Sequence, residues 1–443
     1  MNNRMHEIAD ADFDNLVKDL RSSLAIRCVL EESQMTKEHP FGKKLTEVLD
    51  NFLDCAKGLG FEVKNIANMA GYAEIGEGER LIGVLAHLDV VPEGEASSWN
   101  FPPYAGEISN NVLYGRGTMD DKGPAFSALY AAKALRDSGA ALNCRIRVIV
   151  GIDEESGSRC MERYLETEEV PSCSFSPDAA FPIINAEKGI MNCYFEKEFG
   201  GATKNGEPRL LSMNGGIRYN VVPDRAEAVF DGVFSGEDAK KLASLDGIVV
   251  KSIGGTTTVA AKGVTAHAMC PDTGVNAITK LFNALAQVRF APADAARYIA
   301  DAAKLLADTD GSALGVARSD EVSGPLTCNA GMMSFKDSKL RVCLDLRYPV
   351  THSGKELAED LEKSIAAVGA SLTIVRDSEP LFVEPDHPLV RKLKEAWKNI
   401  TGDDAVPMSI GGGTYCRSLP NAVSFGPIFP GEPDLDHQPN EHL

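Results

Sequence analysis

The sequence predicts an α/β layered sheet followed by a separate α+β domain. Strand and helix patterns alternate over roughly the first 186 of the 443 residues, and hairpin and helix patterns come after them. Alternating strands and amphipathic helices are typical of layered α/β sheets, whereas hairpins followed by helices are typical of α+β domains. A chain of this length can form two or more domains, each with its own core.

The elements of the first part follow from their apolar patterns. "FGKKLTEVLDNFLDCAKGLG" places its apolar residues on one helical face and ends on glycines. The helix in "GPAFSALYAAKALRDSG" is expected to open near Pro124, because proline suits a first helical turn, and to end at Gly139. The remaining patterns predict strands at 61–66, 72–76, 81–90 and 144–152 and a helix at 159–168.

The second part contains both strand and helix patterns. "TTTVAAKG" is typical of a strand and "GVNAITKLFNALAQV" of an amphipathic helix. "GMMSFKDSKLRVCLDLRYPV" predicts a hairpin that turns at Lys336 and Asp337. The next helix is expected to start at Ser353, with Glu356 completing a capping box. From about residue 381 the sequence returns to turn-rich and glycine-rich segments.

The composition excludes two classes of partner. With 45 Lys and Arg against 64 Asp and Glu, the net charge of −19 repels nucleic acid and anionic membranes. No apolar run approaches the ~20 residues of a membrane span, and the amino terminus has no signal-peptide core. The 10 cysteines are scattered, which predicts buried thiols in a reducing cytoplasm, although their even count also allows a disulfide.

Two buried strands end in polar side chains. In "LIGVLAHLDVVPEG", His87 and Asp89 share a face if the strand continues through both residues. The pair is then either a metal ligand with the carboxylate that orients it, or a structural hydrogen bond. "VIVGIDEESGS" ends in Asp153, Glu154 and Glu155. If Glu154 and Glu155 are still extended, one can ligate a metal while the other takes a proton from water. The alternative for this stretch is an acidic solvated loop.

Three other segments add candidate ligands. Asp120 and Asp121 in "LYGRGTMDDKGP" lie where a helix begins, so one of them can simply be a helix cap. Asp178 follows a proline in an apolar run, and His437 lies in the polar loop "PDLDHQPNE". Imidazole and carboxylate ligands together suit zinc, or less specifically manganese or cobalt. Five spaced candidates are enough for a two-metal centre bridged by a carboxylate and a water.

The order of these segments resembles a known family. "HLDVVPEG", "GRGTMDDKGP", "DEESGS", "SPDAAFP" and "HQPNE" together resemble the co-catalytic di-zinc metallopeptidases. That family contains bacterial PepV-like dipeptidases, which are the nearest in pattern, together with carnosinases, acetylornithine-type deacylases and glutamate carboxypeptidases. The resemblance covers nearly the whole chain. It implies a catalytic domain at 1–186 and 381–443, with a mixed, mostly parallel sheet flanked by helices, and an inserted α+β lid domain at 187–380.

The resemblance implies a set of metal ligands around two Zn²⁺ ions, with Mn²⁺ or Co²⁺ as alternatives. His87, Asp120 and Asp178 would hold one ion. Asp120 would bridge to the second ion, which Glu155 and His437 complete.

The resemblance also implies catalytic and substrate-binding residues. Glu154 would be the general base for a metal-bridging water, whose hydroxide attacks the amide carbonyl, and Asp89 would orient His87. His267, in "KGVTAHAMCPDTG", would donate to the oxyanion; by itself it is a helix-entry histidine. The expected substrate contacts are Asn220 in "RYNVVPDRA", Arg347 in "LDLRYPV", and Gly411, Gly412 and Gly413 in "IGGGTYCRSLP". Without the family, Arg347 reads as an exposed hairpin arginine and the glycines as a flexible turn.

The function implied is zinc-dependent hydrolysis of dipeptides that carry a free carboxylate. An N-acyl-amino-acid deacylase has the same metal chemistry, and a non-catalytic metal-binding or peptide-binding relative is a third reading. The lid is long for the family; in PepV-like members such a lid replaces a dimer partner, so we expect a monomer, with a homodimer as the alternative. Relatives continue into a further helix or two after "HQPNE", so we expect poor support for the His437 segment.

Overall fold

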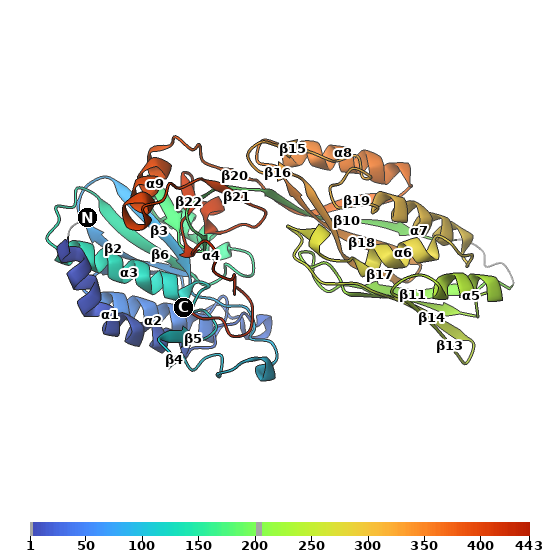
Figure 1. Ribbon diagram of the computed structural model, residues 1–443, viewed down its shortest axis with the longest axis horizontal. Helices are drawn as coiled ribbons and strands as arrows, with labels where there is room; N and C mark the ends of the chain where they lie inside the picture. Colours follow the sequence, from blue (N-terminus) through green and yellow to red (C-terminus); the bar gives the residue numbers. More distant parts are fainter. Residues whose placement is uncertain (1–2, 201–205) are drawn as a thin grey trace. The chain divides into compact units, whose positions relative to one another are not determined.

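The computed structural model describes residues 3–200 and 206–443, which form two compact units (Figure 1). The first unit comprises Met1–Asn185, Val383–Met408 and Gly413–Leu443. The second comprises Ala186–Phe382 and Ser409–Gly412, and is therefore inserted into the chain of the first. Within the described ranges, no helix combines the length and the apolar character that a membrane crossing requires.

A mixed sheet forms the centre of the first unit. Its strand β3 (Leu81–His87) pairs in parallel with β6 (Arg145–Gly151) on one side and β7 (Cys173–Ser176) on the other. Next to β7 lies β22 (Ala422–Ser424), also parallel, so the four central strands share one direction. The flanking strands β1 (Glu62–Ile66), β2 (Ala70–Gly76) and β9 (Ile184–Glu187) pair antiparallel.

Helices flank both faces of this sheet. The chain passes from β3 through α3 (Lys122–Asp137) to β6, and then through α4 (Arg159–Thr167) to β7 on the other side of β3. Because crossovers between parallel strands are right-handed and these two run in opposite directions along the sheet, α3 and α4 cover opposite faces. The remaining helices of this unit are α1 (Asn3–Leu24), α2 (Lys43–Gly58) and α9 (Pro388–Thr401). The predicted fold class was a mixed, mostly parallel sheet flanked by helices. The mixed sheet and its flanking helices are confirmed; the four central strands are parallel, whereas the flanking strands β1 and β2 pair antiparallel.

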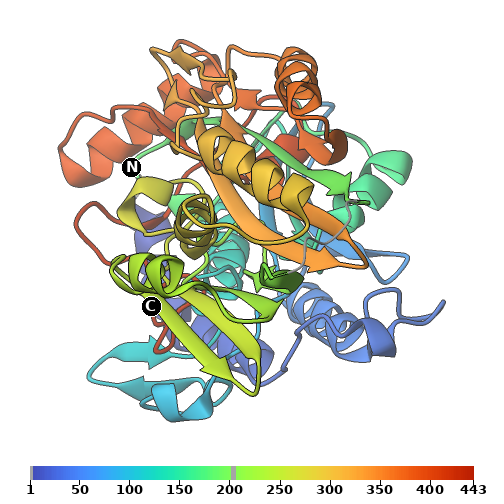
Figure 2. The same cartoon turned by 90° about the vertical axis from the view of Figure 1, so that its right-hand side faces the viewer.

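The second unit is an open antiparallel sheet with helices on one face (Figure 2). Buried and half-buried residues alternate along β10 (Gly189–Glu198), so one face of the strand is buried. This face contributes to a single apolar core that lies between the sheet and the helices. The sheet order is β13-β14-β12-β11-β17-β18-β10-β19. Its other strands are β11 (Arg209–Gly215), β12 (Arg225–Asp231), β13 (Ile248–Ile253), β14 (Thr256–Lys262), β17 (Thr327–Lys336), β18 (Lys339–Tyr348) and β19 (Ser371–Ser378). The helices are α5 (Gly236–Ala243), α6 (Ala277–Leu285), α7 (Ala293–Leu305) and α8 (Gly354–Ala367).

Short elements complete the described chain. They are the strands β4 (Glu107–Ser109), β5 (Val112–Tyr114), β8 (Ala179–Ala180), β15 (Ser319–Asp320), β16 (Gly324–Pro325), β20 (Leu381–Phe382), β21 (Met408–Ile410) and β23 (Pro427–Ile428). Four single turns of 3-10 helix lie at Glu32–Gln34, Ala96–Ser98, Pro271–Thr273 and Tyr415–Ser418.

Three local predictions were wrong in detail. The strand expected at 81–90 ends at His87, so Asp89 lies beyond it. The hairpin between β17 and β18 turns at Asp337 and Ser338, one residue later than expected, because these two residues take the positive φ angles of the turn. The predicted capping box is not formed, since the Ser353 side chain makes no cap hydrogen bond to α8.

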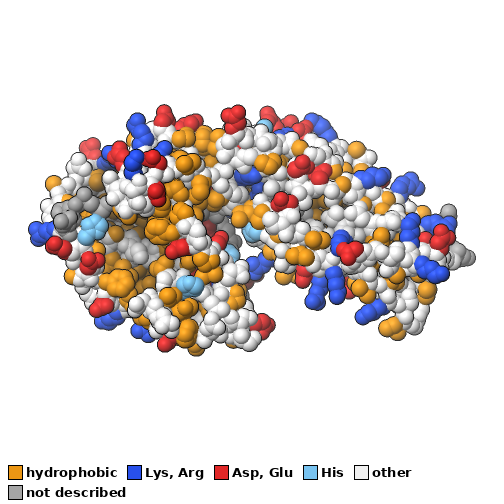
Figure 3. Space-filling view, viewed as in Figure 1, with side chains coloured by type: hydrophobic (Ala, Val, Ile, Leu, Met, Phe, Trp, Pro, Cys, Tyr) orange, Lys and Arg blue, Asp and Glu red, His pale blue; other side chains and the backbone are white. Residues whose placement is uncertain are grey.

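The cysteines and the surface charges bear on two expectations from composition. All ten cysteines lie in the described ranges, and all are free thiols. On the face shown in Figure 3, acidic and basic side chains are interspersed. The negative net charge is therefore not gathered into one acidic patch on that face.

Candidate metal centre

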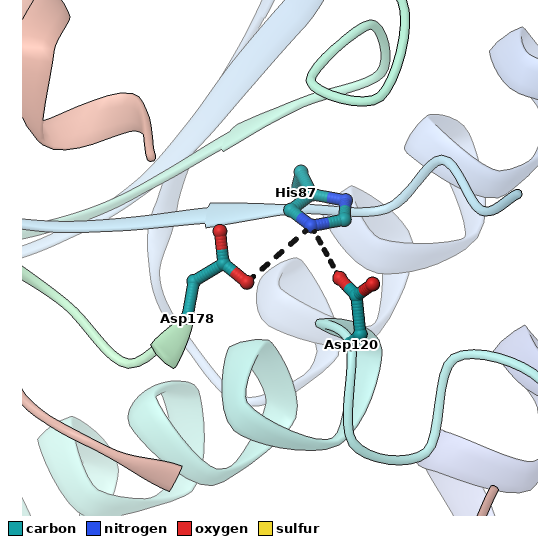
Figure 4. A group of neighbouring side chains, drawn as sticks. All are labelled: His87, Asp120 and Asp178. Carbon is teal, nitrogen blue, oxygen red and sulfur yellow. Dashed lines mark ion pairs between the residues drawn. The ribbon is translucent and has the colours of Figure 1, made fainter. Parts of the chain in front are cut away.

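The candidate site lies at the carboxyl end of the central parallel strands. His87 is the last residue of β3, Asp120 lies in the turn before α3, and Asp178 lies between β7 and β8 (Figure 4). Parallel strands place their carboxyl ends at one edge of a sheet, where the connecting loops converge. Side chains from one strand end and two separate loops therefore meet at one point in the first unit.

His87, Asp120 and Asp178 form the first cluster of potential ligand atoms. The Nε2 atom of His87 lies 2.8 Å from Oδ1 of Asp120 and 3.7 Å from Oδ1 of Asp178 (Figure 4). The His87 side chain is only 1% exposed, so its position is set by packing. One oxygen or nitrogen atom from each residue lies within 4.8 Å of the others.

Asp120, Glu155 and His437 form the second cluster. The Nε2 atom of His437 lies 3.1 Å from Oδ2 of Asp120 and 3.1 Å from Oε2 of Glu155. The His437 side chain is 54% exposed, so this cluster lies at the more open side of the site. Asp120 thus presents one carboxylate oxygen to each imidazole and is shared by both clusters.

The two clusters fit metal ions by distance and by ligand chemistry. Tetrahedral zinc with bonds of about 2.0–2.1 Å to nitrogen and oxygen separates its ligand atoms by about 3.3 Å. The separations of 2.8, 3.1 and 3.7 Å bracket that value. Each cluster combines one imidazole with two carboxylates, which is a ligand set that suits zinc.

The electrostatics of the site favour added positive charge. Burial and the Asp120 carboxylate raise the pKa of Glu155 to about 7, and burial also raises the pKa of Asp178. Although burial disfavours a charged imidazole, hydrogen bonds to Asp120 and Glu155 raise the pKa of His437 to about 11. Buried carboxylates that lie close together therefore stabilise a cation placed between them, such as a metal ion.

Asp89 holds the site in a way that the sequence reasoning did not foresee. The Nδ1 atom of His87 lies 3.0 Å from the backbone carbonyl oxygen of Asp89 and 3.5 Å from its carboxylate. Because a carbonyl only accepts, Nδ1 carries the proton and Nε2 is left with the lone pair that a metal ligand needs. The Asp89 carboxylate accepts the backbone N–H groups of Glu154 and Glu155, each at 3.1 Å.

The acidic run after β6 is a turn, so the condition of an extended backbone at Glu154 and Glu155 is not met. The turn separates the three carboxylates instead. Asp153 is buried and pairs with Arg159 through contacts of 2.6 and 2.8 Å, and Glu155 faces His437. Burial raises the pKa of Glu154 well above its usual value, while the charge on His87 acts in the opposite direction.

Asp121 has a structural contact that its sequence context did not indicate. Its Oδ2 atom accepts the backbone N–H of His87 at 3.0 Å, and the residue is fully buried. The two adjacent aspartates therefore have different roles. Asp120 faces the imidazoles of His87 and His437, and Asp121 binds the backbone at the end of β3. The Asp121 side chain, at the cap position, makes no cap hydrogen bond to α3.

Five of the six predicted residues for oxyanion and substrate contacts belong to the second unit, and Gly413 belongs to the first. Asn220 and His267 lie on neighbouring segments, where the Ala268 N–H donates to the Asn220 carbonyl at 2.9 Å. The Nδ1 atom of His267 accepts the Met269 N–H at 3.2 Å, so the neutral ring carries its proton on Nε2. This is the protonation state that an oxyanion donor requires.

Arg347 is buried, so its reading as an exposed hairpin arginine is wrong. Its Nε and Nη2 atoms form a two-pronged pair with Asp345 at 2.5 and 2.9 Å, and Nη1 donates to the Gly411 carbonyl at 3.0 Å. A Cβ atom at Gly411 would lie 2.6 Å from that of Met269, so only glycine fits there. Arg347 therefore anchors the glycine segment, and its contact with substrate stays a prediction.

Two site residues were missed from the sequence. Glu441 lies in the segment "HQPNE", from which only His437 received a role, and it accepts hydrogen bonds from the Asp120 loop. Arg116 lies in "GRGTMDDKGP" and pairs with Glu441. Both residues lie in segments that carry the family resemblance, and this was the sequence feature that could have indicated a role for them. The expected poor support of the His437 segment is contradicted by these contacts and by the paired backbones of Leu113 and Leu443.

Comparison with known proteins gives a consistent result. Residues 83–443 match the model of "Peptidase family M20/M25/M40". A Bacillus subtilis protein named "Putative dipeptidase YtjP" is 38% identical over 445 residues, covering 97% of this chain and 93% of the relative. A metallo-carboxypeptidase of the M20 family from Sulfolobus solfataricus has a similar fold, with a TM-score of 0.58, 17% identity and coverage of 97% and 94%. Aminoacylhistidine dipeptidase from Vibrio alginolyticus gives a TM-score of 0.56, 16% identity and coverage of 96% and 92%.

Proposed function

The chain belongs to peptidase family M20/M25/M40, and from this premise we propose that it is a zinc-dependent dipeptidase. The observation that carries the proposal is the position of Asp120, whose two oxygens face His87 at 2.8 Å and His437 at 3.1 Å. A carboxylate shared in this way is what a pair of closely spaced metal ions needs as a bridge. The name of the Bacillus subtilis relative supports dipeptides as the substrates.

We assign the five ligands to two ions. His87, Asp120 and Asp178 hold one Zn²⁺, and Asp120, Glu155 and His437 hold the other, with Mn²⁺ or Co²⁺ as substitutes. When bound, these ions lower the pKa of water and polarise the amide carbonyl.

The protein's own groups then handle the protons. Glu154 takes a proton from the attacking water and gives it to the leaving amine, so that the C–N bond is replaced by a C–O bond and two amino acids are released. Burial raises the pKa of Glu154, which strengthens it as a proton acceptor. Asp89 fixes the backbone of Glu154 and so sets the position of this base.

The remaining predicted residues supply the proposed contacts to the rest of the substrate. His267, with its proton on Nε2, donates to the oxyanion that develops on the carbonyl. Asn220 and Arg347 contact the substrate, whose free carboxylate is received by the backbone N–H groups of Gly411, Gly412 and Gly413. The second unit is a long insertion in a single chain, and on this ground we propose that His267 acts within a monomer. The ten free thiols support a reducing, cytoplasmic location.

The test is a comparison of substrates with and without metal. We would measure the zinc content of the purified protein and its hydrolysis of a panel of free dipeptides and of N-acetyl amino acids, before and after treatment with a chelator. We expect about two equivalents of zinc and chelator-sensitive cleavage of dipeptides. Cleavage of the N-acetyl compounds alone identifies a deacylase, and zinc binding without any cleavage identifies a binding protein; either result overturns the dipeptidase proposal.

A further inference from the structure

Glu441 is a fully buried carboxylate in the first unit that none of the proposed steps uses. Its Oε1 atom accepts three backbone N–H groups of the loop before α3, those of Gly117 at 2.9 Å, Met119 at 2.9 Å and Asp120 at 3.2 Å. The loop is therefore folded around one carboxylate oxygen. The last of the three donors is the backbone of the residue whose side chain faces both histidines.

The second oxygen of Glu441 links this loop to the segment that carries His437. Nη1 of Arg116, which is also buried, lies 2.5 Å from Oε2 of Glu441 and donates to the Gln438 carbonyl at 3.3 Å. The Gly115 N–H also donates to the Glu441 carbonyl at 3.0 Å. Arg116 and Glu441 thus hold together two segments that lie more than 300 residues apart in sequence, one bearing Asp120 and the other bearing His437.

Charge explains why these contacts are strong. Hydrogen bonds to an ionised carboxylate are stronger than those between neutral groups, and Arg116 supplies the opposite charge inside the same buried cluster. Removing either partner leaves the other charge buried without compensation. An alanine at position 441 would also leave three buried N–H groups without their acceptor.

We propose that Glu441 is a positioning residue for the metal centre, which keeps Asp120 and His437 at the separation that two ions require. This inference rests on the proposed function. It assigns to Glu441 no contact with substrate or with a reacting atom, because the residue acts through the backbone of Asp120 and through Arg116. The expected consequence of loosening it is weaker metal binding, since partners that orient metal ligands typically contribute about 10–100-fold to metal affinity.

The decisive measurement is Zn²⁺ binding to the metal-free full chain, by competition with a chromophoric chelator. Glu441→Gln keeps the size of the side chain and one acceptor oxygen but loses the charge that Arg116 faces. Glu432→Gln is the matched control, because Glu432 lies on the same carboxyl-terminal segment but is exposed. We expect Glu441→Gln to weaken Zn²⁺ binding about 10–100-fold and Glu432→Gln to leave it unchanged.

Thermal unfolding of the metal-free proteins separates positioning from a purely structural role. A cooperative transition shows that each variant is folded, and Arg116→Lys, which keeps the charge but not the guanidinium geometry, serves as the second variant if Glu441→Gln does not fold. A folded variant of either residue that binds Zn²⁺ as tightly as the wild type overturns the inference, even if its unfolding temperature has fallen. A wild-type chain that binds no Zn²⁺ overturns the proposed function itself, so the two failures are distinguishable.

Discussion

The carboxylate of Asp89 accepts the backbone N–H of Glu154 at 3.1 Å, so a residue two positions after the proposed metal ligand His87 also fixes the turn that carries the proposed base. The first prediction concerns this link. Asp89→Asn replaces one acceptor oxygen by an amide that faces an N–H group, and so loosens the turn. We expect kcat to fall about 10–100-fold with KM little changed, because Glu154, as the proposed base, would act on the reacting water and not on ground-state binding.

Steady-state kinetics on one dipeptide, at saturating zinc, measures this effect. Asp403→Asn is a suitable control, because Asp403 is exposed after α9 and far along the chain from the candidate ligands. A variant at position 89 with wild-type kcat would show that the turn keeps its geometry without Asp89.

The second prediction tests the base itself. Glu154→Gln preserves shape but cannot take a proton, so kcat should fall by a factor of about 10²–10⁴, the usual contribution of general acid–base catalysis. Zinc content should stay at the wild-type value, because Glu154 belongs to neither ligand cluster. Metal analysis and kinetics on the same preparation check both statements, and unchanged hydrolysis would exclude Glu154 as the base.

The third prediction concerns metal removal. Burial raises the pKa of Glu155 and of Asp178, and the Asp120 carboxylate acts in the same direction on both, so a bound cation should relieve an electrostatic cost in the metal-free protein. Zinc at about 100 times its dissociation constant should stabilise the folded state by about 2.7 kcal/mol. Calorimetry with chelator, and again after zinc is restored, should show a lowered and then recovered unfolding temperature. An unfolding temperature that is the same with and without chelator would contradict the prediction that the purified protein contains a stabilising metal ion.

The fourth prediction is a pH effect in the second unit. Asp320 accepts the N–H groups of Ser323 and Thr351 and both of their hydroxyls. Although burial acts in the opposite direction, these bonds lower the pKa of Asp320 below its usual value. A carboxyl with a depressed folded-state pKa stabilises the protein above its unfolded pKa of about 3.9 and loses that contribution as pH falls through the lower, folded value.

Asp320→Asn should therefore cost about 1–3 kcal/mol of unfolding free energy at pH 7. The difference from the wild type should shrink below about pH 4, where the wild-type carboxyl takes up a proton. Urea unfolding at several pH values measures it, with Asp403→Asn as the exposed control. A difference that stays constant down to pH 2 would show that the charge of Asp320 is irrelevant.

The fifth prediction concerns a buried amide behind two proposed substrate contacts. The Nδ2 atom of Asn329 donates to the carbonyls of Tyr219 and Val221, the neighbours of Asn220, at 2.9 and 3.0 Å. Asn329→Ala would leave these carbonyls without a donor and lower the unfolding free energy by about 1–3 kcal/mol. It should also reduce kcat/KM, because the Asn220 segment pairs with that of His267. Asn283→Ala, at an exposed position on α6, is the control for both measurements.

The sequence predicted the first unit well where local periodicity determines structure. The strand before His87 and the helix after Asp121 follow from apolar patterns and breaker residues, which act over a few positions. The turn at Asp337 was placed one residue early, because the pattern on either side does not specify which residues take positive φ angles. The capping box at Ser353 failed because the motif allows such a bond but does not require it.

The candidate site shows where sequence reasoning reaches its limit. By itself, the sequence determined which residue types were available and that several of them follow buried strands, since both are local properties. Only the tertiary structure decided which of two adjacent aspartates faces the imidazoles, how the carboxylates after β6 are separated, and that Arg347 is already paired. The role of Glu441 is the clearest case, because its contact with Gly117 joins residues 324 positions apart. Such contacts depend on how the sheet brings its loops together, and no pattern within either segment contains that information.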